Sequence, residues 1–411
     1  MHRRSNVLLI VFVIFMMGFP GIIDANGGTA VEELRQYVAE DVQKREPLSE
    51  QSFAQQPLTK EEAEEAFEIL WEDMKQQIAA SRQEALDARV ITVDGVSMKF
   101  DYKIFGEPVE GKRSLYISMH GGGGTTPEVN DQQWENQKGL YEPEEGIYLA
   151  PRAPSNDWNL WHKPHIDPLF DYLISTLVVL ENVDPNRVYL MGYSAGGDGV
   201  YQLAPRMADR FAAAAMMAGH PNDAEPYGLR NIGFTIHMGG QDKAYNRNTV
   251  AKEWGEWLEK LQEADPEGYK HWVAIYPTYG HWMNRVDRAA VPWMAKFVRD
   301  PYPNRVVWRQ DDVTHTRFYW LGIREEDQQA RATVIASYED QTIQIEQSDV
   351  KVLKIRLNDE MVDLDQPIKV VFGEKVLFSG KVERTIETMA AALQERQDPA
   401  SVFYAEITVE L

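Results

Sequence analysis

The chain has 411 residues, no cysteine and a formal net charge of −22, with 64 acidic against 42 basic side chains. Its length exceeds the roughly 250–300 residues of a single hydrophobic core, and its 44% hydrophobic content excludes disorder of the whole chain. The acidic balance argues against nucleic acid or anionic membranes as partners, and the missing cysteine excludes disulfides, thiolate catalysis and thiolate metal sites.

Residues 1–25 have the layout of a secretory signal peptide. His2, Arg3 and Arg4 form a basic start, and residues 7–19 then run apolar. The run is shorter than the roughly 18–20 residues of a spanning helix, so a membrane anchor is the weaker alternative and no stable membrane span is expected. We therefore expect a secreted or periplasmic protein.

Residues 26–88 are predicted to be helical. Thr59 and Glu62 have the spacing of a capping box, and apolar residues recur at three- and four-residue steps from Ala63 to Ile78. Residues 43–58 resemble a linker between two helical pieces. The apolar face is expected to dock on the following domain of the same chain rather than on a partner.

Residues 89–302 are predicted to form an α/β domain. Asp94-Gly95 lies between two alternating stretches, which is a hairpin signal. Strands are then expected at 115–119, 147–150, 188–191, 211–218, 232–238 and 272–276, and helices near 168–182, 195–206, 246–263 and 287–298. This alternation is typical of a mostly parallel sheet with helices on both faces, whose functional loops follow the carboxyl ends of the strands.

Residues 303–411 are predicted to be an all-β sandwich, because the helical patterns largely stop. Short apolar runs recur at roughly 8–12-residue spacing, as is typical of such domains. The expected strands are 306–308, 316–321, 332–337, 342–346, 352–357, 368–372, 375–378 and 402–409. The domain is expected to be either a spacer or a module packed on the preceding one.

The sharpest motif is Gly192-Tyr193-Ser194-Ala195-Gly196, between a predicted strand and a predicted helix. Glycines on both sides relieve crowding at a sharp turn that pushes the serine hydroxyl outward, which is the setting of a nucleophile elbow. The alternative is an ordinary glycine-rich turn. We predict that Ser194 is a catalytic nucleophile.

A serine nucleophile needs a base within hydrogen-bond reach and an acid that orients the base. His281 follows the last predicted strand of the α/β domain, and we predict that it is the base; His162, His165 and His220 are the competitors. Asp242 follows the preceding strand and is the predicted acid. Asp223 is the runner-up, and a helix N-cap is the alternative role of Asp242.

Attack on a carbonyl creates an oxyanion that needs backbone donors. His120 and four glycines follow a predicted strand, so Gly121 and Gly122, with the Ala195 N–H, are predicted to form an oxyanion hole. Phosphate cradling is the weaker alternative, because no Gly-Lys-Ser/Thr follows.

Aromatic and histidine side chains also lie in the loops at this predicted edge. We predict contact with substrate for Trp158, Trp161, His162, His165 and Trp282. A zinc site at His162 and His165 would need a third ligand that the sequence does not place. We therefore expect no metal and no cofactor.

Residues 90–300 resemble the α/β-hydrolase superfamily, in particular extracellular esterases grouped with polyhydroxybutyrate depolymerases, feruloyl and acetyl-xylan esterases and prolyl-oligopeptidase-like hydrolases. The matching segments are His120–Gly124, Asp184–Gly197, Gly239–Asp242 and Gly280-His281. The resemblance implies an α/β-hydrolase fold with Ser194 as nucleophile, Asp242 as acid and His281 as base. Unlike prolyl oligopeptidases, the chain has no room for a propeller. Unlike disulfide-bearing secreted esterases, it has no cysteine. Residues 303–411 look like an immunoglobulin-like or fibronectin-like sandwich.

These observations predict a secreted serine hydrolase of carboxylic esters that acts through an acyl-enzyme. The expected substrate is a small-molecule or polysaccharide-linked ester. A serine exopeptidase or amidase with the same triad, and a non-catalytic cell-envelope binding protein, are the alternatives.

Overall fold

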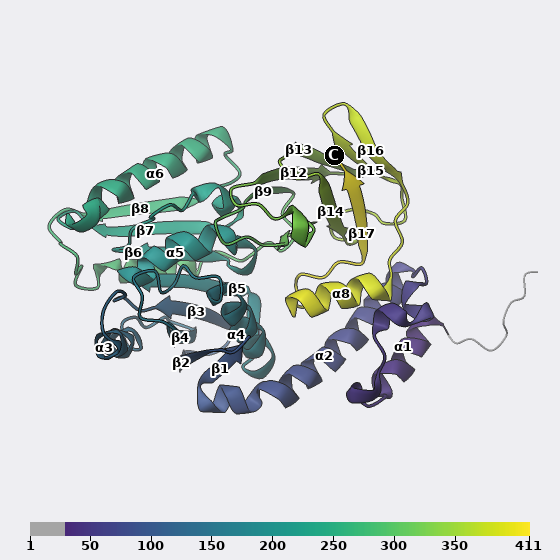
Figure 1. Ribbon diagram of the computed structural model, residues 1–411, viewed down its shortest axis with the longest axis horizontal. Coiled ribbons are helices and arrows are strands. Elements are labelled where there is room, and N and C mark those ends of the chain that lie inside the picture. Colours follow the sequence, from purple (N-terminus) through teal and green to yellow (C-terminus); the bar gives the residue numbers. More distant parts are fainter. Residues whose placement is uncertain (1–28) are drawn as a thin grey trace, which may run out of the picture.

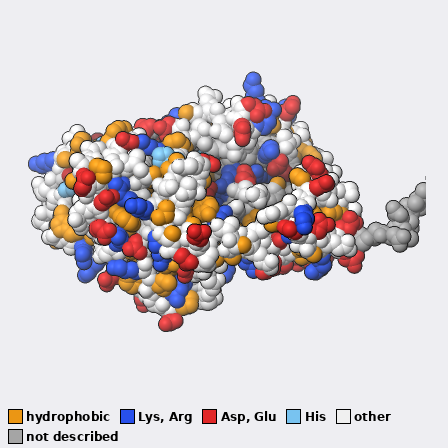
Figure 2. Space-filling view, turned by 60° about the horizontal axis from the view of Figure 1, so that its bottom comes forward, with side chains coloured by type: hydrophobic (Ala, Val, Ile, Leu, Met, Phe, Trp, Pro, Cys, Tyr) orange, Lys and Arg blue, Asp and Glu red, His pale blue; other side chains and the backbone are white. Residues whose placement is uncertain are grey.

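The computed structural model describes residues 29–411, so the predicted signal segment lies outside the described residues. Within them, no helix is both long enough and apolar enough to cross a membrane. Figure 1 shows a helical arm at the N-terminus, a large sheet flanked by helices, and a β region at the C-terminus. In the view of Figure 2, acidic and basic side chains lie interspersed with hydrophobic ones.

The N-terminal arm contains the long helix α2 (Lys60–Ala88) and the shorter α1 (Ala30–Ala39). Thr59 and Glu62 form the predicted capping box, and three short 3₁₀ turns occupy most of the predicted linker. The second half of α2 packs on helix α4 (Ile166–Leu180) and strand β1 (Val90–Val93). Its first half packs instead on α1 and on the C-terminal helix α8 (Ile386–Arg396), so α2 joins both domains.

The large sheet has eight strands among the described residues, in the order β1-β2-β4-β3-β5-β6-β7-β8. β1 and β2 form the predicted hairpin around Asp94-Gly95, β2 pairs antiparallel with β4, and the remaining pairs are parallel. The predicted mostly parallel arrangement is confirmed. After β1, the strands are β2 (Val96–Phe105), β3 (Arg113–Met119), β4 (Gly146–Arg152), β5 (Val183–Tyr193), β6 (Ala213–Met217), β7 (Gly233–Gly239) and β8 (His271–Tyr276).

Helices cover both faces of this sheet. Helices α4, α5 (Ala195–Arg206) and α6 (Arg247–Ala264) pack into the main apolar core on one face. On the other face lie α3 (Pro127–Gln137) and the short α7 (Ala290–Met294).

Two of these helices differ from the predictions. Helix α3 was not predicted, because its side chains are mostly polar and only Asn130 and Gln137 are buried. The predicted helix 287–298 is wrong in extent: a 3₁₀ turn (Val286–Ala289) precedes the five-residue α7. In a continuous helix from residue 287, the N–H of residue 292 would donate to the carbonyl oxygen of residue 288, but Pro292 has no N–H.

The C-terminal region contains two β sheets, with orders β10-β11-β14-β17 and β16-β15-β13-β12-β9. The expected absence of helices is wrong, because α8 lies between β16 and β17. Strands β13 and β15 pair in parallel, and the immunoglobulin-like assignment stays a prediction. The strands are β9 (Arg305–Arg309), β10 (Arg317–Phe318), β11 (Leu321–Gly322), β12 (Thr333–Glu339), β13 (Thr342–Ser348), β14 (Val352–Leu357), β15 (Ile368–Phe372), β16 (Lys375–Gly380) and β17 (Ala405–Glu410).

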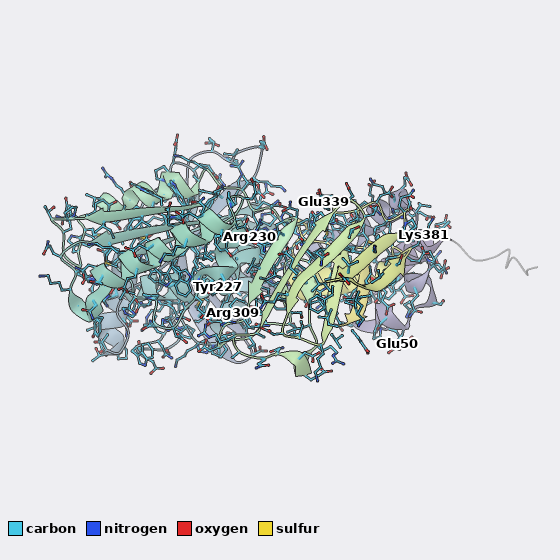
Figure 3. The ribbon with its side chains drawn as sticks, turned by 90° about the horizontal axis from the view of Figure 1, so that it is seen from above. Glu50, Tyr227, Arg230, Arg309, Glu339 and Lys381 are labelled. Carbon is cyan, nitrogen blue, oxygen red and sulfur yellow. The ribbon has the colours of Figure 1, made fainter. Side chains whose placement is uncertain are left out.

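The C-terminal region packs directly on the α/β domain, and one apolar cluster includes buried side chains of both. Figure 3 shows Tyr227, Arg230 and Arg309 at this junction. Arg230 donates to the side chain of Asp265 at 2.6 Å and to the backbone oxygen of Arg305 at 3.1 Å. Arg309 donates to Glu225 at 2.7 Å.

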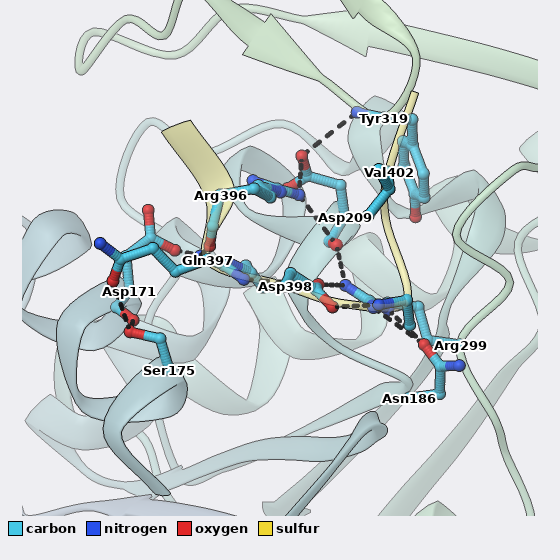
Figure 4. A network of polar contacts seen from close by, with 12 residues as sticks. Asp171, Ser175, Asn186, Asp209, Arg299, Tyr319, Arg396, Gln397, Asp398 and Val402 are labelled. Atoms are coloured by element: carbon cyan, nitrogen blue, oxygen red, sulfur yellow. Dashed lines mark hydrogen bonds and ion pairs between the residues drawn. The ribbon is translucent and has the colours of Figure 1, made fainter. Parts of the chain in front are cut away.

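A buried charge network also crosses the junction (Figure 4). Asp398, which is 1% exposed, accepts from Arg299 at 2.7 Å and from Arg210 at 3.4 Å. Burial alone would raise the pKa of the Asp398 carboxyl, but these two guanidinium charges outweigh burial and lower it. Charges buried this deeply require a fixed arrangement of their partners, so the C-terminal region is a packed module rather than a spacer.

Candidate active site

Ser194 lies between the end of β5 and the start of α5, with φ 57° and ψ −122°. An L-residue rarely adopts this backbone conformation, and such strain is stored where a side chain must be aimed. Gly192 and Gly196 must be glycines because backbone oxygens lie too close for a side chain. A Cβ on Gly192 would lie 2.2 Å from the Gly196 oxygen, and one on Gly196 would lie 2.1 Å from the Met119 oxygen. The motif therefore forms the sharp strand–turn–helix that the sequence predicts.

His281 lies beyond β8 and Asp242 beyond β7, at the same edge of the sheet as Ser194. The His281 Nε2 atom is 2.9 Å from Ser194 Oγ, and its Nδ1 atom is 2.6 Å from Asp242 Oδ2. Because the carboxylate accepts, Nδ1 carries the proton, and Nε2 presents its lone pair to the serine hydroxyl. The structure thus brings the three predicted residues into one hydrogen-bonded chain.

Asp242 is 3% exposed, whereas His281 lies at the surface of the site. The other acid candidate, Asp223, lies elsewhere: it pairs with Arg331 at 2.7 Å and accepts from Gln202 at 3.2 Å. Geometry favours Asp242 over Asp223 as the partner of His281.

Tyr193 positions the backbone on both sides of Trp282. Its hydroxyl donates to the His281 carbonyl oxygen at 2.5 Å and accepts from the Met283 N–H at 3.0 Å. The residue next to the nucleophile therefore also holds the segment that carries the base. The sequence analysis missed this role, since nothing in the motif shows where the tyrosine hydroxyl points.

His120 supports the glycine loop from within the core. The Ala153 N–H donates to His120 Nε2 at 3.1 Å, so Nδ1 carries the proton and donates to the Gly121 oxygen at 2.6 Å. Burial lowers the pKa of His120 to about 4, which keeps the ring neutral at pH 7. The Trp161 indole donates to the His120 oxygen at 2.9 Å.

Asn130, on α3, fixes the shape of the glycine loop. Gly122 and Gly123 have φ of +101° and +79°, and the Gly123 N–H donates to Asn130 Oδ1 at 2.8 Å. The Asn130 amide group reaches Asn156 Oδ1 at 3.0 Å, and the side chain is fully buried. Sequence reasoning missed Asn130, and the absence of an apolar pattern around it explains why.

Ser194 and His281 open into a cleft of about 640 Å³. Gly121 and Gly122 line one side of it, and Trp282, which is 50% exposed, lines another. These glycines therefore lie in the same cleft as Ser194, and their role as oxyanion donors stays a prediction. Ala195, whose N–H is the other predicted donor, follows Ser194 at the first position of α5.

The remaining predicted substrate contacts lie outside the lining of this cleft. The predicted contact of Trp161 with substrate is wrong, because this side chain is fully buried against His120. Trp158 is 62% exposed and stands edge-on to His162, beside the glycine loop. Burial lowers the pKa of His162 to about 4, and the pKa of His165 is also lowered by burial.

A group of three carboxylates elsewhere has oxygen spacing that could hold a cation: Asp223, Asp311 and Asp312. Arg331 already pairs with two of them, reaching Asp223 at 2.7 Å and Asp311 at 2.9 Å. Arg206 also lies 3.5 Å from Asp311, so two guanidinium groups already approach these carboxylates.

Residues 154–308 match the dienelactone hydrolase family, and this segment contains Ser194, Asp242 and His281. The resemblance to the α/β-hydrolase superfamily is confirmed. No curated protein sequence matches the chain.

Solved structures with a similar arrangement include three hydrolases. A thermostable esterase is 18% identical over 51% of this chain and 62% of that chain, with a TM-score of 0.39. A ferulic acid esterase is 16% identical over 50% of this chain and 96% of that chain, with a TM-score of 0.37. A poly(3-hydroxybutyrate) depolymerase from Bordetella parapertussis is 15% identical over 49% of this chain and 84% of that chain, with a TM-score of 0.37.

Proposed function

We propose that this esterase-type hydrolase cleaves carboxylic esters through a Ser-His-Asp triad and an acyl-enzyme. The observation that carries the proposal is the hydrogen-bonded chain from Asp242 through His281 to Ser194, with distances of 2.6 and 2.9 Å. The match to the dienelactone hydrolase family supports the reaction class.

In the first half-reaction, His281 Nε2 takes the hydroxyl proton as Ser194 Oγ attacks the ester carbonyl. Asp242 stabilises the resulting imidazolium, and backbone N–H groups of the glycine loop and Ala195 donate hydrogen bonds to the negatively charged carbonyl oxygen. The tetrahedral intermediate collapses as His281 returns the proton to the leaving alcohol. The acyl group is then bound to Ser194 Oγ.

In the second half-reaction, a water molecule gives a proton to His281 and attacks the acyl-enzyme. Collapse of the second intermediate returns the proton to Ser194 and releases the carboxylic acid.

The test is hydrolysis of p-nitrophenyl acetate and butyrate by the wild type and by Ser194→Ala. Loss of such a nucleophile lowers kcat by a factor on the order of 10⁶, so the variant is expected to fall to background. Equal activity of the two proteins would contradict the proposal. Matching amide substrates separate an esterase from an amidase, since an amidase hydrolyses both.

Asp242→Asn and Asp223→Asn decide the acid. Replacing Asp242 removes the acceptor of the His281 Nδ1–H, and such a change in a triad costs about 10⁴ in kcat. Asp223→Asn is the matched control and is expected to retain activity, because Asp223 pairs with Arg331 away from the site. Collapse on Asp223→Asn alone would overturn the assignment.

We also propose that the protein is exported and that its substrate is a small-molecule or polysaccharide-linked ester. The basic and apolar start of the chain supports export. Fractionation of cells expressing the full chain tests it, and retention in the cytoplasm would contradict it. Screening acetylated and feruloylated sugars against simple alkyl esters tests the substrate.

A further inference from the structure

A second, larger cavity of about 1110 Å³ adjoins the catalytic cleft. The two share Leu140 and Arg285 in their linings, so these two residues lie at the border between the cavity and the cleft. It lies on the sheet face that carries α3 and α7, between the loop 139–145 and the segment 285–295 that follows His281. The mechanism proposed above makes no use of it.

Buried contacts define the shape of this cavity. The Tyr141 hydroxyl donates to the Asp287 side chain, and this bond ties the loop 139–145 to the segment 285–295. Tyr141 is 2% exposed and Asp287 is 0% exposed. On its floor, Tyr116 is held by stacking on Tyr189 at 4.8 Å. The walls are therefore tied together rather than loosely apposed.

The lining suits an elongated, partly apolar molecule. Val109, one of the exposed large hydrophobic residues of the described chain, faces this space together with Val286, Val291 and Pro292. Glutamate and arginine side chains complete the lining, including Glu142 and Arg288. Ser114, near the start of β3, also lines the cavity, so the cavity extends along this strand away from the catalytic edge of the sheet.

The chemistry of the triad indicates which part of an ester would enter. The carbonyl oxygen must face the glycine loop, and the leaving oxygen must face His281 Nε2, which returns its proton. Arg285, at the entrance to the second cavity, lies four residues after His281 on the same segment. Because the leaving oxygen faces His281, the alcohol side of the ester is the side nearer to the segment that carries Arg285.

We propose that this second cavity binds the alcohol arm of an elongated ester and makes the enzyme selective for long leaving alcohols. The inference rests on the proposed function, because it assigns the direction of the ester from the triad. A buried methylene group gains up to roughly fourfold in affinity, so alcohol length is expected to raise kcat/KM steeply.

The test uses acetates of ethanol, butanol, hexanol and octanol, which all form the same acetyl-enzyme. Deacylation is then identical across the series, and differences in kcat/KM report on the alcohol alone. For the wild type, kcat/KM for octyl acetate is expected to exceed that for butyl acetate at least tenfold. Methyl esters of acids of increasing length form the companion series and are expected to show a flatter profile.

Two substitutions fill the cavity without touching the triad, Ala289→Trp and Ala295→Trp. Both alanines line it, and Ala295 is exposed. Each variant is expected to abolish the preference for octyl acetate and to keep p-nitrophenyl acetate hydrolysis within about twofold of the wild type. Ala264→Trp, at an exposed position at the end of α6, is the matched control and should leave the series unchanged.

Inhibition by the product alcohol gives a second measurement. Octanol is expected to inhibit p-nitrophenyl acetate hydrolysis more strongly than butanol in the wild type and equally weakly in Ala295→Trp. A flat alcohol series, or a preference that survives both tryptophan substitutions, would overturn the inference while leaving the esterase proposal intact. Absence of hydrolysis of any ester would instead refute the proposed function.

Discussion

Replacement of Asn130 tests how the glycine loop is held. Asn130 Oδ1 accepts the Gly123 N–H at 2.8 Å, and its amide reaches Asn156 at 3.0 Å. Asn130→Ala leaves the partly buried Gly123 N–H unpaired and frees a loop whose glycines adopt positive φ. Removal of an oxyanion-hole donor costs about 2.7–4 kcal/mol, or 10²–10³ in kcat. Displacing the loop without deleting a donor is expected to cost about 100-fold, at the low end of this range.

Steady-state hydrolysis of p-nitrophenyl acetate and urea unfolding measure the two consequences of this change. We expect kcat to fall with KM nearly unchanged, and stability to fall by about 1 kcal/mol because a partly buried donor loses its partner. Asn130→Asp retains the acceptor and should recover part of the activity. Gln132→Ala, at an exposed position on the same helix, is the control. A folded Asn130→Ala protein with wild-type kcat would refute this role of Asn130.

Three further predictions concern buried polar groups. Asp398→Ala leaves Arg299 and Arg210 buried without their shared carboxylate, so the free energy of unfolding in urea should fall by about 3–5 kcal/mol. A fall of less than about 1 kcal/mol would contradict a tightly packed junction. Burial raises the pKa of Asp198 to about 6, so its protonated form stabilises the fold at pH 4 and this contribution is lost as the pH rises through about 6. An asparagine at this position cannot ionise, so from pH 4 to pH 8 the free energy of unfolding of Asp198→Asn should rise by about 2 kcal/mol relative to that of the wild type. A difference between the two proteins that does not change with pH would argue against the raised pKa. Tyr193→Phe removes the hydrogen bonds that hold the segment of His281, so kcat should fall about tenfold. Labelling of Ser194 by a fluorophosphonate should slow in parallel. An unchanged labelling rate would count against this positioning role.

Motifs with strict backbone requirements were predictable from the sequence. The turn at Ser194 needs glycines on both sides, and the Asp94-Gly95 hairpin needs positive φ at its centre, so both leave a clear local pattern. The parallel strands are apolar runs, and the order of strands along the chain placed Asp242 and His281 at the same edge as Ser194.

Features that depend on contacts between distant segments were not predictable. Helix α3 buries polar rather than apolar side chains, so it lacks the periodicity that reveals α4 or α5. Trp161 was predicted to contact substrate, but the side chain packs beside His120 in the core. Helix α8 does carry a helical pattern, with Ile386, Met389 and Leu393 buried, yet it lies among short strands that dominated the interpretation of that region.

The most direct test of the central claim is identification of the residue that a fluorophosphonate probe modifies. The wild-type protein is incubated with the probe, digested and analysed by mass spectrometry, with Ser194→Ala as the control. We predict a single adduct on Ser194 in the wild type and none in the variant, because only a serine activated by His281 attacks the phosphorus centre. Absence of an adduct in the folded wild type, or modification of another residue, would contradict the account.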